Sequence, residues 1–267
     1  MTKSLSVGVI GAGVMGEAII AALVSYGVSP KLITISEKRK DRCDELINRY
    51  GINASEIEEN VSGAQVLLLV VKPQDMAGVL ADVKDVINSK TLVVSFAAGK
   101  KISFIANALG TDNPIVRVMP NTATLVGAGM AAISLGQGVT PEQSGFVTGF
   151  LAATGRVVEV SEELQDAVTA TSGSGPAYFF RFVEAMVDGA KELGLSDEIA
   201  TLLTVQTMIG AAKLLEESGK SASTLRENVT SPNGTTAAAL ASFDTNQIST
   251  MVANAMKAAR DRSQELA

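Results

Sequence analysis

The segment LSVGVIGAGVMG, residues 5–16, constrains the fold of this chain more than any other. A short β-forming apolar run leads into glycines spaced GxGxxG, and the helical run VMGEAIIAALVSYG follows directly. In a strand–turn–helix unit, Gly11 allows a tight turn, Gly13 lets the backbone approach a pyrophosphate, and Gly16 lets the helix pack closely on the strand. The phosphates of such a ligand lie at the helix N-terminus. The segment therefore predicts a dinucleotide-binding unit near the start of the chain.

Strand and helix signals alternate through the first half of the chain. The run AQVLLLVVKP is apolar without alternation, as a strand buried on both faces of a parallel sheet requires. KRKDRCDELINRYG is an amphipathic helical run that ends in glycine, and the other strand-like runs are KLITIS, TLVVSFAAG, PIVRVMPN, GMAAISLG and GRVVEV. This order predicts an α/β Rossmann-type domain with a doubly wound, mostly parallel sheet over residues 1–160.

The second half of the chain has a different character. Three long segments carry helical periodicity, and no convincing strand follows residue 160. We therefore expect an all-α domain of five or six helices over residues 161–267. Helical runs such as TLLTVQTMIGAAKLL are apolar over more than one face. They either complete a dimer or form a central helix buried within one subunit.

Composition excludes several classes of function. The 267 residues contain no His, which rules out imidazole as an acid, a base or a metal ligand. The single cysteine, Cys43, cannot form an internal disulfide, and no zinc-binding spacing is present, so we expect no metal. The net charge of −6, with no basic run longer than EKRKDR, argues against nucleic-acid binding. No uninterrupted apolar run is long enough for a bilayer and the N-terminus is not a signal peptide, so we expect a cytoplasmic protein without a membrane segment.

The end of the second strand bears on the choice between NADPH and NADH. An acid there would bind the ribose 2′-hydroxyl of NADH. The strand instead ends in Ser36, which is followed by Glu37, Lys38 and Arg39. A hydroxyl beside two cations suits a 2′-phosphate. The alternative is that Lys38 and Arg39 form a solvated helix start, and Glu37 complicates the interpretation. We expect NADPH, with NADH as the alternative.

Three further segments end strands of the predicted sheet. They are VVKPQ, SFAAG and RVMPNT, and the carboxyl ends of such strands are where ligands bind. Lys72 is either a ligand contact or a side chain that extends to solvent. The small residues of SFAAG let the backbone approach a flat ring, and Asn121 can hydrogen-bond an amide.

Two motifs of the second half remain. In TSGSGPAYF, Ser174 can cap a helix and Pro176 suits its first turn, so the motif is a binding element or a plain helix–helix corner. In SPNGTT, Ser231 and Asn233 are candidate caps and two threonines follow in the first turn. A helix N-terminus with free N–H groups and hydroxyls binds a carboxylate without a cationic side chain, and ordinary capping is the alternative.

Taken together, these motifs resemble those of the pyrroline-5-carboxylate reductases. GAGVMG, VKPQ, SFAAG, RVMPNT, SGSGPAYF and SPNGTT occur in the family's order over essentially the whole chain, and SGSGPAY with the late SPxGxT is the most specific pair. The chain departs from the family pattern at Ala123, where Pro is common, and at Asn233, where Gly is common. Asn tolerates left-handed backbone, so we expect the second turn to persist.

The resemblance implies reduction of the cyclic imine 1-pyrroline-5-carboxylate to L-proline by NAD(P)H, the last step of proline biosynthesis. It also implies a homodimer built through the helical domain, and it allows dimers to assemble further, up to a decamer of dimers. A protonated imine is already electrophilic, so hydride transfer to it needs no histidine acid. The absence of His therefore fits this reaction better than ketone reduction.

The resemblance also assigns the segment from Ser231 to Thr236 to the substrate carboxylate. We expect Thr236 to be the catalytic residue, as a positioning group and proton relay at the ring nitrogen. The expected substrate-binding residues are Asn228, Ser231, Gly234, Thr235 and Thr236. The expected cofactor-binding residues are Gly11, Gly13, Val14, Met15, Gly16, Ser36, Arg39, Val71, Lys72, Pro73, Ala97, Ala98 and Asn121.

Two other functions compete with this hypothesis. β-Hydroxyacid dehydrogenases resemble the chain in their GxGxMG loop and helical second half, but they use a catalytic Lys followed by Asn one turn later. Here Lys213 is followed four residues later by Glu217. A non-catalytic NADP-sensing protein is the second rival, and the intact threonine and small-residue motifs argue against it.

Overall fold

The structure is a computed structural model that describes residues 4–266. Among these residues the chain forms two compact units. The first comprises residues 4–174 together with residues 259–266, and the second comprises Gly175–Ala258.

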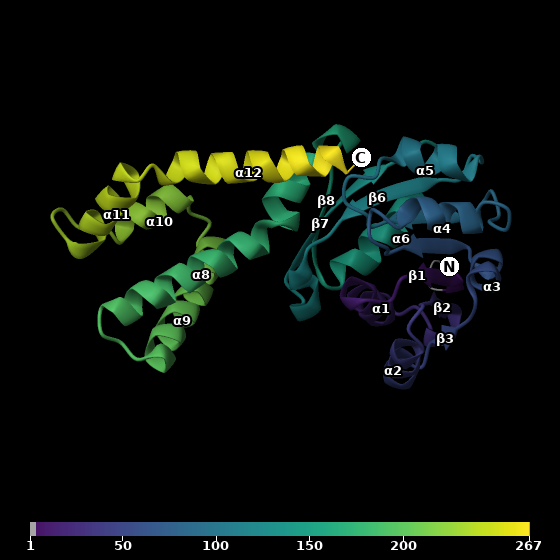
Figure 1. Cartoon of the computed structure of the whole chain (residues 1–267), viewed down its shortest axis with the longest axis horizontal. Helices are drawn as coiled ribbons and strands as arrows, with labels where there is room; N and C mark the ends of the chain where they lie inside the picture. The colour runs from purple at the N-terminus through teal and green to yellow at the C-terminus, as the bar shows by residue number, and fades with distance from the viewer. Residues whose placement is uncertain (1–3, 267) are drawn as a thin grey trace. The chain divides into compact units, whose positions relative to one another are not determined.

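An eight-stranded sheet forms the centre of the first unit, with the order β3-β2-β1-β4-β5-β6-β7-β8 (Figure 1). Neighbouring strands are parallel except for β6 and β7. Because the chain runs from β1 to β2 on one side and later returns to β4 on the other, β1 and β4 flank the topological switch point. The strands are β1 (Val7–Ile10), β2 (Ile33–Ser36), β3 (Asn53–Ala54), β4 (Val66–Leu69), β5 (Leu92–Ser95), β6 (Ile115–Met119), β7 (Gly129–Leu135) and β8 (Gly155–Glu159).

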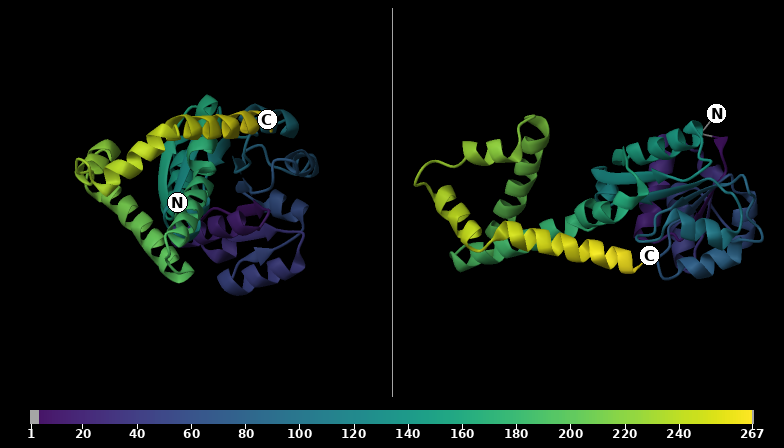
Figure 2. Two further views of the ribbon diagram at one scale, coloured as in Figure 1. Left: turned by 60° about the vertical axis from the view of Figure 1, so that its left-hand side comes forward. Right: turned by 90° about the horizontal axis from the view of Figure 1, so that it is seen from above.

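Helices cover both faces of this sheet, as Figure 2 shows. Alternate residues of one strand enter opposite layers: Leu68 packs with α1, α2 and α6, whereas Leu67 packs with α3, α4 and α5. The doubly wound, mostly parallel sheet is therefore confirmed. The helices are α1 (Val14–Tyr26), α2 (Lys40–Tyr50), α3 (Ile57–Gly63), α4 (Met76–Val83), α5 (Ile102–Leu109) and α6 (Pro141–Ala152), with short 3₁₀ turns η2 (Pro30–Leu32), η3 (Thr122–Val126) and η4 (Glu162–Leu164).

The rest of the chain is helical, and among the described residues no strand follows Glu159, as expected. The elements are α7 (Gln165–Val168), a π-helical turn η5 (Thr169–Gly173), α8 (Gly175–Glu192), α9 (Asp197–Glu217), α10 (Ala222–Asn228), α11 (Thr235–Thr245) and α12 (Ile248–Glu265). The helical region therefore begins close to the expected boundary at residue 161.

The compact units nevertheless divide later, between Ser174 and Gly175. Residues 162–174 are helical but are attached to the sheet: Gln165 Nε2 donates to Ser134 Oγ on β7 at 2.8 Å. The guanidinium of Arg117 is buried in β6 and lies 3.4 Å from Glu162 and 3.5 Å from Asp166. These polar contacts explain why the first helical residues belong to the Rossmann-type unit.

The last part of α12 also belongs to the first unit. Ser263, only 2% exposed, donates from its hydroxyl to Asp166 Oδ1 at 2.7 Å. A Cβ on Gly99 would lie 2.7 Å from the Ser263 carbonyl oxygen, so the loop after β5 and this helix approach each other at backbone distance. Gly99 also has a φ of +76°, a second reason for glycine at this position.

The second unit has almost no core of its own. Of its described residues only Gly175, Ala200 and Thr204 are buried. Helix α8 packs against α9, and the Phe182 ring lies 6.3 Å from that of Phe243. Most of the larger apolar side chains of this unit remain exposed.

Helix α9 is also long and apolar enough to cross a membrane by length and composition alone, and it is the one such helix in the described part of the chain. This match does not overturn the expectation that no uninterrupted apolar run is long enough for a bilayer, because Gln206 and Lys213 interrupt the apolar sequence of α9. The core helix of a soluble protein passes the same test.

Candidate active site

The glycine loop between β1 and α1 has the local geometry expected for GxGxxG. Gly11 has a φ of +90°, and a Cβ there would lie 2.5 Å from the Val70 carbonyl oxygen. A Cβ on Gly16 would collide with the carbonyl oxygen of Gly11, so the helix–strand contact requires glycine. Gly13 faces open space and is the N-cap of α1 without a side-chain cap. The loop therefore presents free N–H groups at an open helix N-terminus, where Val14 and Met15 are the first two helical residues.

The other expected cofactor residues are collected at the same edge of the sheet. Strands β1, β4, β5 and β6 are mutually parallel neighbours, so their carboxyl ends lie side by side. The glycine loop follows β1 and the segment Val71–Lys72–Pro73 follows β4, on the two sides of the switch point. Ala97 and Ala98 follow β5, and Asn121 follows β6. The sheet therefore brings these motifs together at the position where doubly wound proteins bind nucleotides.

Individual residues at this edge differ in what they offer a ligand. The Lys72 side chain is exposed, which is compatible with a ligand contact and with simple solvation. Ala97 is buried and Ala98 is half-buried. Asn121 Oδ1 accepts a hydrogen bond from Met130 N at 3.1 Å. Asn121 can therefore offer a ligand its amide N–H groups, while its oxygen holds the following loop.

Ser36 and Arg39 are both engaged within the protein. The Ser36 hydroxyl donates to the Ser55 carbonyl oxygen at 3.0 Å and accepts from Asn60 Nδ2 at 2.9 Å. Arg39 pairs with Asp41 at 2.5 Å, and both side chains are about two-thirds exposed, at 69% and 71%. Arg39 can leave such an exposed pair at little cost. The Ser36 hydroxyl, in contrast, has no proton left to donate to a phosphate.

Two residues that were not among the expected site residues, Glu37 and Arg42, hold the glycine loop. Glu37 Oε2 accepts from Ala12 N at 2.9 Å, and Arg42 Nε donates to the Ala12 carbonyl oxygen at 3.0 Å. Both polar groups of one loop residue are thus bound by side chains that follow β2. The sequence feature that could have identified Glu37 is an acidic residue directly after a strand that is expected to lie beside the glycine turn.

A charge cluster ties α1 to α2 behind this loop. Burial opposes ionisation of Glu17, but hydrogen bonds from Arg42, Tyr50 and Arg49 outweigh it and lower the pKa of this carboxyl. Hydrogen bonds to Glu17 and Glu45 raise the pKa of Arg42. The cluster therefore keeps Arg42 charged and in place beneath the glycine loop.

The TSGSGPAYF motif passes through a π-helical turn rather than a break. Ser174 N donates to the Thr169 carbonyl oxygen at 2.8 Å, and Ser174 has helical backbone angles, so it is not the helix cap that we expected. The i→i+5 bond widens the helix instead of ending it, and the chain continues into α8. A Cβ on Gly173 would collide with Met119 Cε, which places this turn against the end of β6. Such π turns are frequent at functional sites.

The start of α11 is open in the way that anion binding requires. Its N-cap is Gly234, without a side-chain cap, whereas α9 and α10 begin with Ser196 and Ser221, whose hydroxyls accept backbone N–H groups. Ser231 and Asn233 therefore do not cap this helix with their side chains. The choice between a carboxylate site and a plain helix start stays a prediction. A Cβ on Gly234 would collide with Ser231 Oγ, so a larger residue there would have to displace the Ser231 hydroxyl.

The SPNGTT turn keeps the conformation that we expected despite its Asn. Asn233 has a φ of 59°, in the left-handed region, and Gly234 N donates to the Ser231 carbonyl oxygen at 3.0 Å. Thr235 is exposed and Thr236 is half-buried at the start of the helix, and Asn228 is the last residue of α10. The expected substrate residues thus belong to the second unit, and the expected cofactor residues belong to the first.

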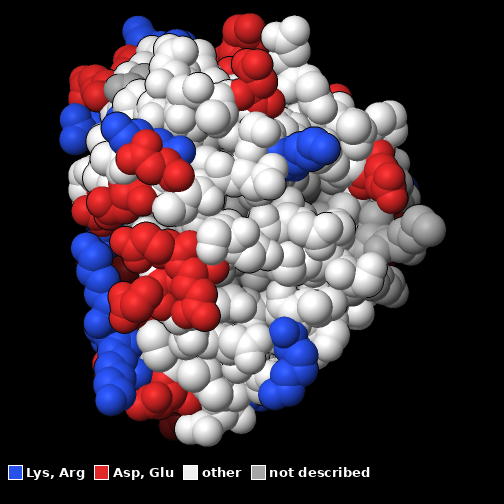
Figure 3. All heavy atoms as spheres, turned by 90° about the vertical axis from the view of Figure 1, so that its right-hand side faces the viewer, with Lys and Arg blue, Asp and Glu red and all other residues white. Residues whose placement is uncertain are grey.

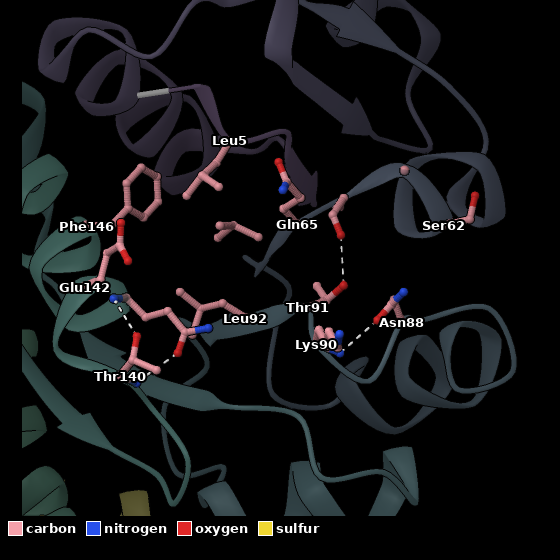
Figure 4. A pocket seen from close by; sticks show the side chains of 14 residues that line it. Leu5, Ser62, Gln65, Asn88, Lys90, Thr91, Leu92, Thr140, Glu142 and Phe146 are labelled. Atoms are coloured by element: carbon pink, nitrogen blue, oxygen red, sulfur yellow. Dashed lines mark hydrogen bonds between the residues drawn. The ribbon is translucent and has the colours of Figure 1, made fainter. Parts of the chain in front are cut away.

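The sizeable cavities of the first unit are elsewhere. One cavity has a volume of about 540 Å³ and lies at the amino ends of β4 and β5. Figure 4 shows the side chains that line it, among them Leu5, Gln65 and Phe146. Several of its polar groups are paired within the protein: Thr91 Oγ1 donates to the Ala64 carbonyl oxygen at 2.8 Å, and Thr140 forms a capping box with Gln143. None of the expected site residues lines it, so we do not assign it to the chemistry.

Charges and metal ligands add no further site. On the face drawn in Figure 3, basic side chains lie along the left edge beside a group of acidic side chains, and most of the rest of the face is uncharged. Within residues 4–266, no group of three or more His, Cys, Asp or Glu side chains could hold a metal ion.

Comparison with known proteins is consistent with this arrangement. Residues 162–266 match the family model described as pyrroline-5-carboxylate reductase dimerisation, and residues 6–99 match the one described as NADP oxidoreductase, coenzyme F420-dependent. The chain is 38% identical to a pyrroline-5-carboxylate reductase of Corynebacterium melassecola, with 98% of each chain covered.

Solved structures agree with these matches. The pyrroline-5-carboxylate reductase of Coxiella burnetii has a TM-score of 0.90 and 34% identity, and 99% of each chain is covered. The Plasmodium falciparum pyrroline carboxylate reductase, solved with NADP bound, has a TM-score of 0.89 and 29% identity over 99% of this chain and 98% of that one. From the sequence identity to these relatives over nearly the whole chain, we conclude that this chain belongs to the pyrroline-5-carboxylate reductase family.

Proposed function

We propose that this chain reduces 1-pyrroline-5-carboxylate to L-proline by hydride transfer from NADPH, with NADH as the alternative donor, as the last step of proline biosynthesis. The family supports the reaction, and the relative solved with NADP bound supports the cofactor. The observation that carries the proposal is the glycine-led start of α11, which has hydroxyls and no side-chain cap. The glycine loop alone would serve any dinucleotide enzyme.

The cofactor residues follow from the carboxyl edge of the sheet. We place the pyrophosphate at Gly13 and the start of α1, where the N–H groups are free. The segments at Val71–Pro73 and Ala97–Ala98, together with the amide N–H groups of Asn121, are the candidates for contacts with the rest of the dinucleotide. When bound, the nicotinamide supplies the hydride, and the protein supplies position and electrostatics.

The substrate residues follow from the start of α11. The N–H groups of the first turn and the hydroxyls of Ser231 and Thr236 bind the carboxylate, with Thr235 at the first position of α11 and Asn228 at the end of the preceding helix. This arrangement neutralises the carboxylate without placing a cation beside the protonated imine, where it would disfavour that charge. Thr236 positions the ring nitrogen. Hydride addition to the iminium carbon turns the C=N bond into a C–N bond and leaves a neutral amine.

We further propose that two copies of this chain form a homodimer through the second unit. Its exposed apolar side chains and nearly absent core support a partner surface, and so does the match to a dimerisation family model. Further assembly, up to a decamer of dimers, remains part of the proposal. The proposal also includes a cytoplasmic location, with no membrane or nucleic-acid partner. It further includes the functional division of the chain into residues 1–160 and residues 161–267.

The proposal is tested by mixing the purified protein with NADPH and 1-pyrroline-5-carboxylate and following the loss of nicotinamide absorbance together with proline formation. We expect substrate-dependent oxidation near neutral pH. If folded protein shows none, the proposed function is wrong. β-Hydroxy acids with NADP⁺ test the dehydrogenase rival, for which exposed Lys213 on α9 would be the base.

A further inference from the structure

We propose that Glu37 is a specificity-determining residue that restrains the preference of this chain for NADPH over NADH. Its carboxylate is fixed on the glycine loop, where it disfavours a 2′-phosphate and can accept a hydrogen bond from a 2′-hydroxyl. The inference rests on the proposed function only for the identity of the dinucleotide.

The register of the sheet places Glu37 beside the glycine loop. Ser36 pairs with Ile10 in neighbouring parallel strands, and Gly11 N donates to the Ser36 carbonyl oxygen at 3.0 Å. Glu37 is the next residue, and it faces Ala12 across the two strand ends. In dinucleotide-binding folds, an acid at this strand end is placed to bind the ribose 2′-hydroxyl.

Hydrogen bonds hold this carboxylate in place. One oxygen accepts from Ala12 N at 2.9 Å and the other from Arg39 N at 3.1 Å. The Ala12 side chain is fully buried, and its carbonyl oxygen is held by Arg42. Arg42 is in turn paired with Glu17 and Glu45. The negative charge is therefore a fixed part of the loop and not a mobile surface charge.

The neighbouring cations only partly offset this charge. Arg39 is paired with Asp41, and Arg42 with two carboxylates. Lys38 and Lys40 are exposed, so water and salt screen their charges. Ser36 already donates its hydroxyl proton to Ser55, so it can only accept. A 2′-phosphate at this strand end therefore meets a fixed anion as well as mobile cations.

The test is the variant Glu37→Gln, whose amide oxygen can still accept from Ala12 N while the charge is removed. Isothermal titration calorimetry with NADP⁺ and with NAD⁺, without substrate, gives the ratio of the two dissociation constants. We expect the ratio to shift toward NADP⁺ by roughly tenfold at low salt, and by less at high salt because the charge effect is screened.

Two variants control for other causes. Asp44→Asn removes the same charge from an exposed position of α2 and should leave the ratio unchanged. Glu37→Asp keeps the charge and should keep the ratio close to that of the parent, with thermal unfolding of each variant as the folding control. The proposal is overturned if Glu37→Gln shifts the ratio of dissociation constants no more than Asp44→Asn does. It is also overturned if Glu37→Asp shifts the ratio toward NADP⁺ as Glu37→Gln does. In either case Glu37 only supports the loop.

The binding experiment also separates this inference from the proposed function. NADP⁺ and NAD⁺ are titrated without an imine, so a protein that does not reduce pyrroline-5-carboxylate still gives the ratio. Conversely, if the ratio of dissociation constants does not change in Glu37→Gln, only this inference fails and the proposed reductase function still stands.

Discussion

The two compact units of this chain bury their apolar side chains to very different extents. In the first, aliphatic layers on both faces of the sheet are almost fully excluded from solvent, and Leu67 and Leu68 are both 0% exposed. In the second, Phe180 is 61% exposed and Leu202 is 67% exposed. The hydrophobic effect stabilises only surface that is removed from water. The first unit is therefore stabilised from within, whereas the second needs another surface to cover it.

The units nevertheless share one device. Each contains a helix that starts with glycine and has no side-chain cap, α1 after Gly13 and α11 after Gly234. An uncapped helix start carries free N–H groups and the positive end of the helix dipole, which favour an anion. The proposed reaction involves two anions, a dinucleotide and a carboxylate. We therefore propose that each anion binds at one of these two helix starts.

The largest expected effect concerns the apolar face of the second unit. Leu202→Glu places a charge on that face, and burying it against a partner is unfavourable. We expect at least a roughly 100-fold weaker dimer, which corresponds to about 2.7 kcal/mol. Analytical ultracentrifugation of the parent and the variant measures the dimer dissociation constant. Val158→Glu, at an exposed apolar position of β8 in the first unit, is the matched control and should leave association unchanged.

The outcome that breaks this comparison is a parent protein that stays monomeric and active at low micromolar concentration. In that case the exposed side chains of α8 and α9 need no second copy of the chain, and the apolar face has another explanation.

The next effect tests the helix start in the second unit. Thr236→Val keeps the shape of a half-buried side chain and removes its hydroxyl. We expect kcat/KM for pyrroline-5-carboxylate to fall by roughly tenfold to a hundredfold, the scale of one lost hydrogen bond to a charged group. NADPH binding should stay the same. The control is Thr245→Val at the other end of α11, where the hydroxyl only donates to the Ala241 carbonyl oxygen. Equal kinetics in the two variants would leave Thr236 without a role in the site.

Much of the first unit could be predicted from the sequence because its signals are local. Unbroken apolar runs identify strands buried on both faces, and the glycines at Gly11 and Gly16 are required by contacts between segments that the motif itself defines. The turn at Asn233 could be predicted for the same reason, since its left-handed backbone is a property of the residue type.

The misjudged features depend on partners distant in the chain. Ser36 is engaged by Asn60 on α3, and Asn121 by Met130 on β7, so neither residue is as available as its motif suggested. Glu37 was treated only as a complication, because its bond to Ala12 exists only once β1 and β2 are paired. The helix cap expected at Ser174 was wrong since a π turn leaves no mark in the hydrophobic periodicity.

A smaller effect separates two glycines of the first helix start. Gly16→Ala introduces a Cβ against the Gly11 carbonyl oxygen and should destabilise the fold by about 1–3 kcal/mol, as overpacking does. Gly13→Ala meets open space and should leave the melting temperature unchanged. If a pyrophosphate occupies that space, the added Cβ of Gly13→Ala displaces it from the N–H groups of the loop and should weaken NADP⁺ binding by roughly tenfold, the scale of one hydrogen bond to a charge. Differential scanning fluorimetry and calorimetry measure the two effects. Undiminished binding in Gly13→Ala would show that the pyrophosphate lies elsewhere.

The smallest expected effect concerns the charge cluster of Glu17 and its partners behind the glycine loop. It measures how much this cluster contributes to the stability of the first unit. Glu17 has a folded-state pKa below its unfolded value, so its ionised form stabilises the fold above the unfolded pKa. That contribution is lost as the pH falls through the folded pKa. Glu17→Gln should therefore lower the free energy of unfolding by about 1–2 kcal/mol at pH 7, the scale of a hydrogen-bonded charge that remains partly solvated. The difference from the parent should shrink below about pH 4.

Urea unfolding of both proteins from pH 3 to pH 7 measures this difference in the free energy of unfolding. The control is Glu142→Gln in the first turn of α6, which also removes one acid at a helix start. A difference that does not change with pH would show that packing, and not the ionised carboxylate, is the contribution of Glu17. The link from Arg42 to the glycine loop would then not depend on charge.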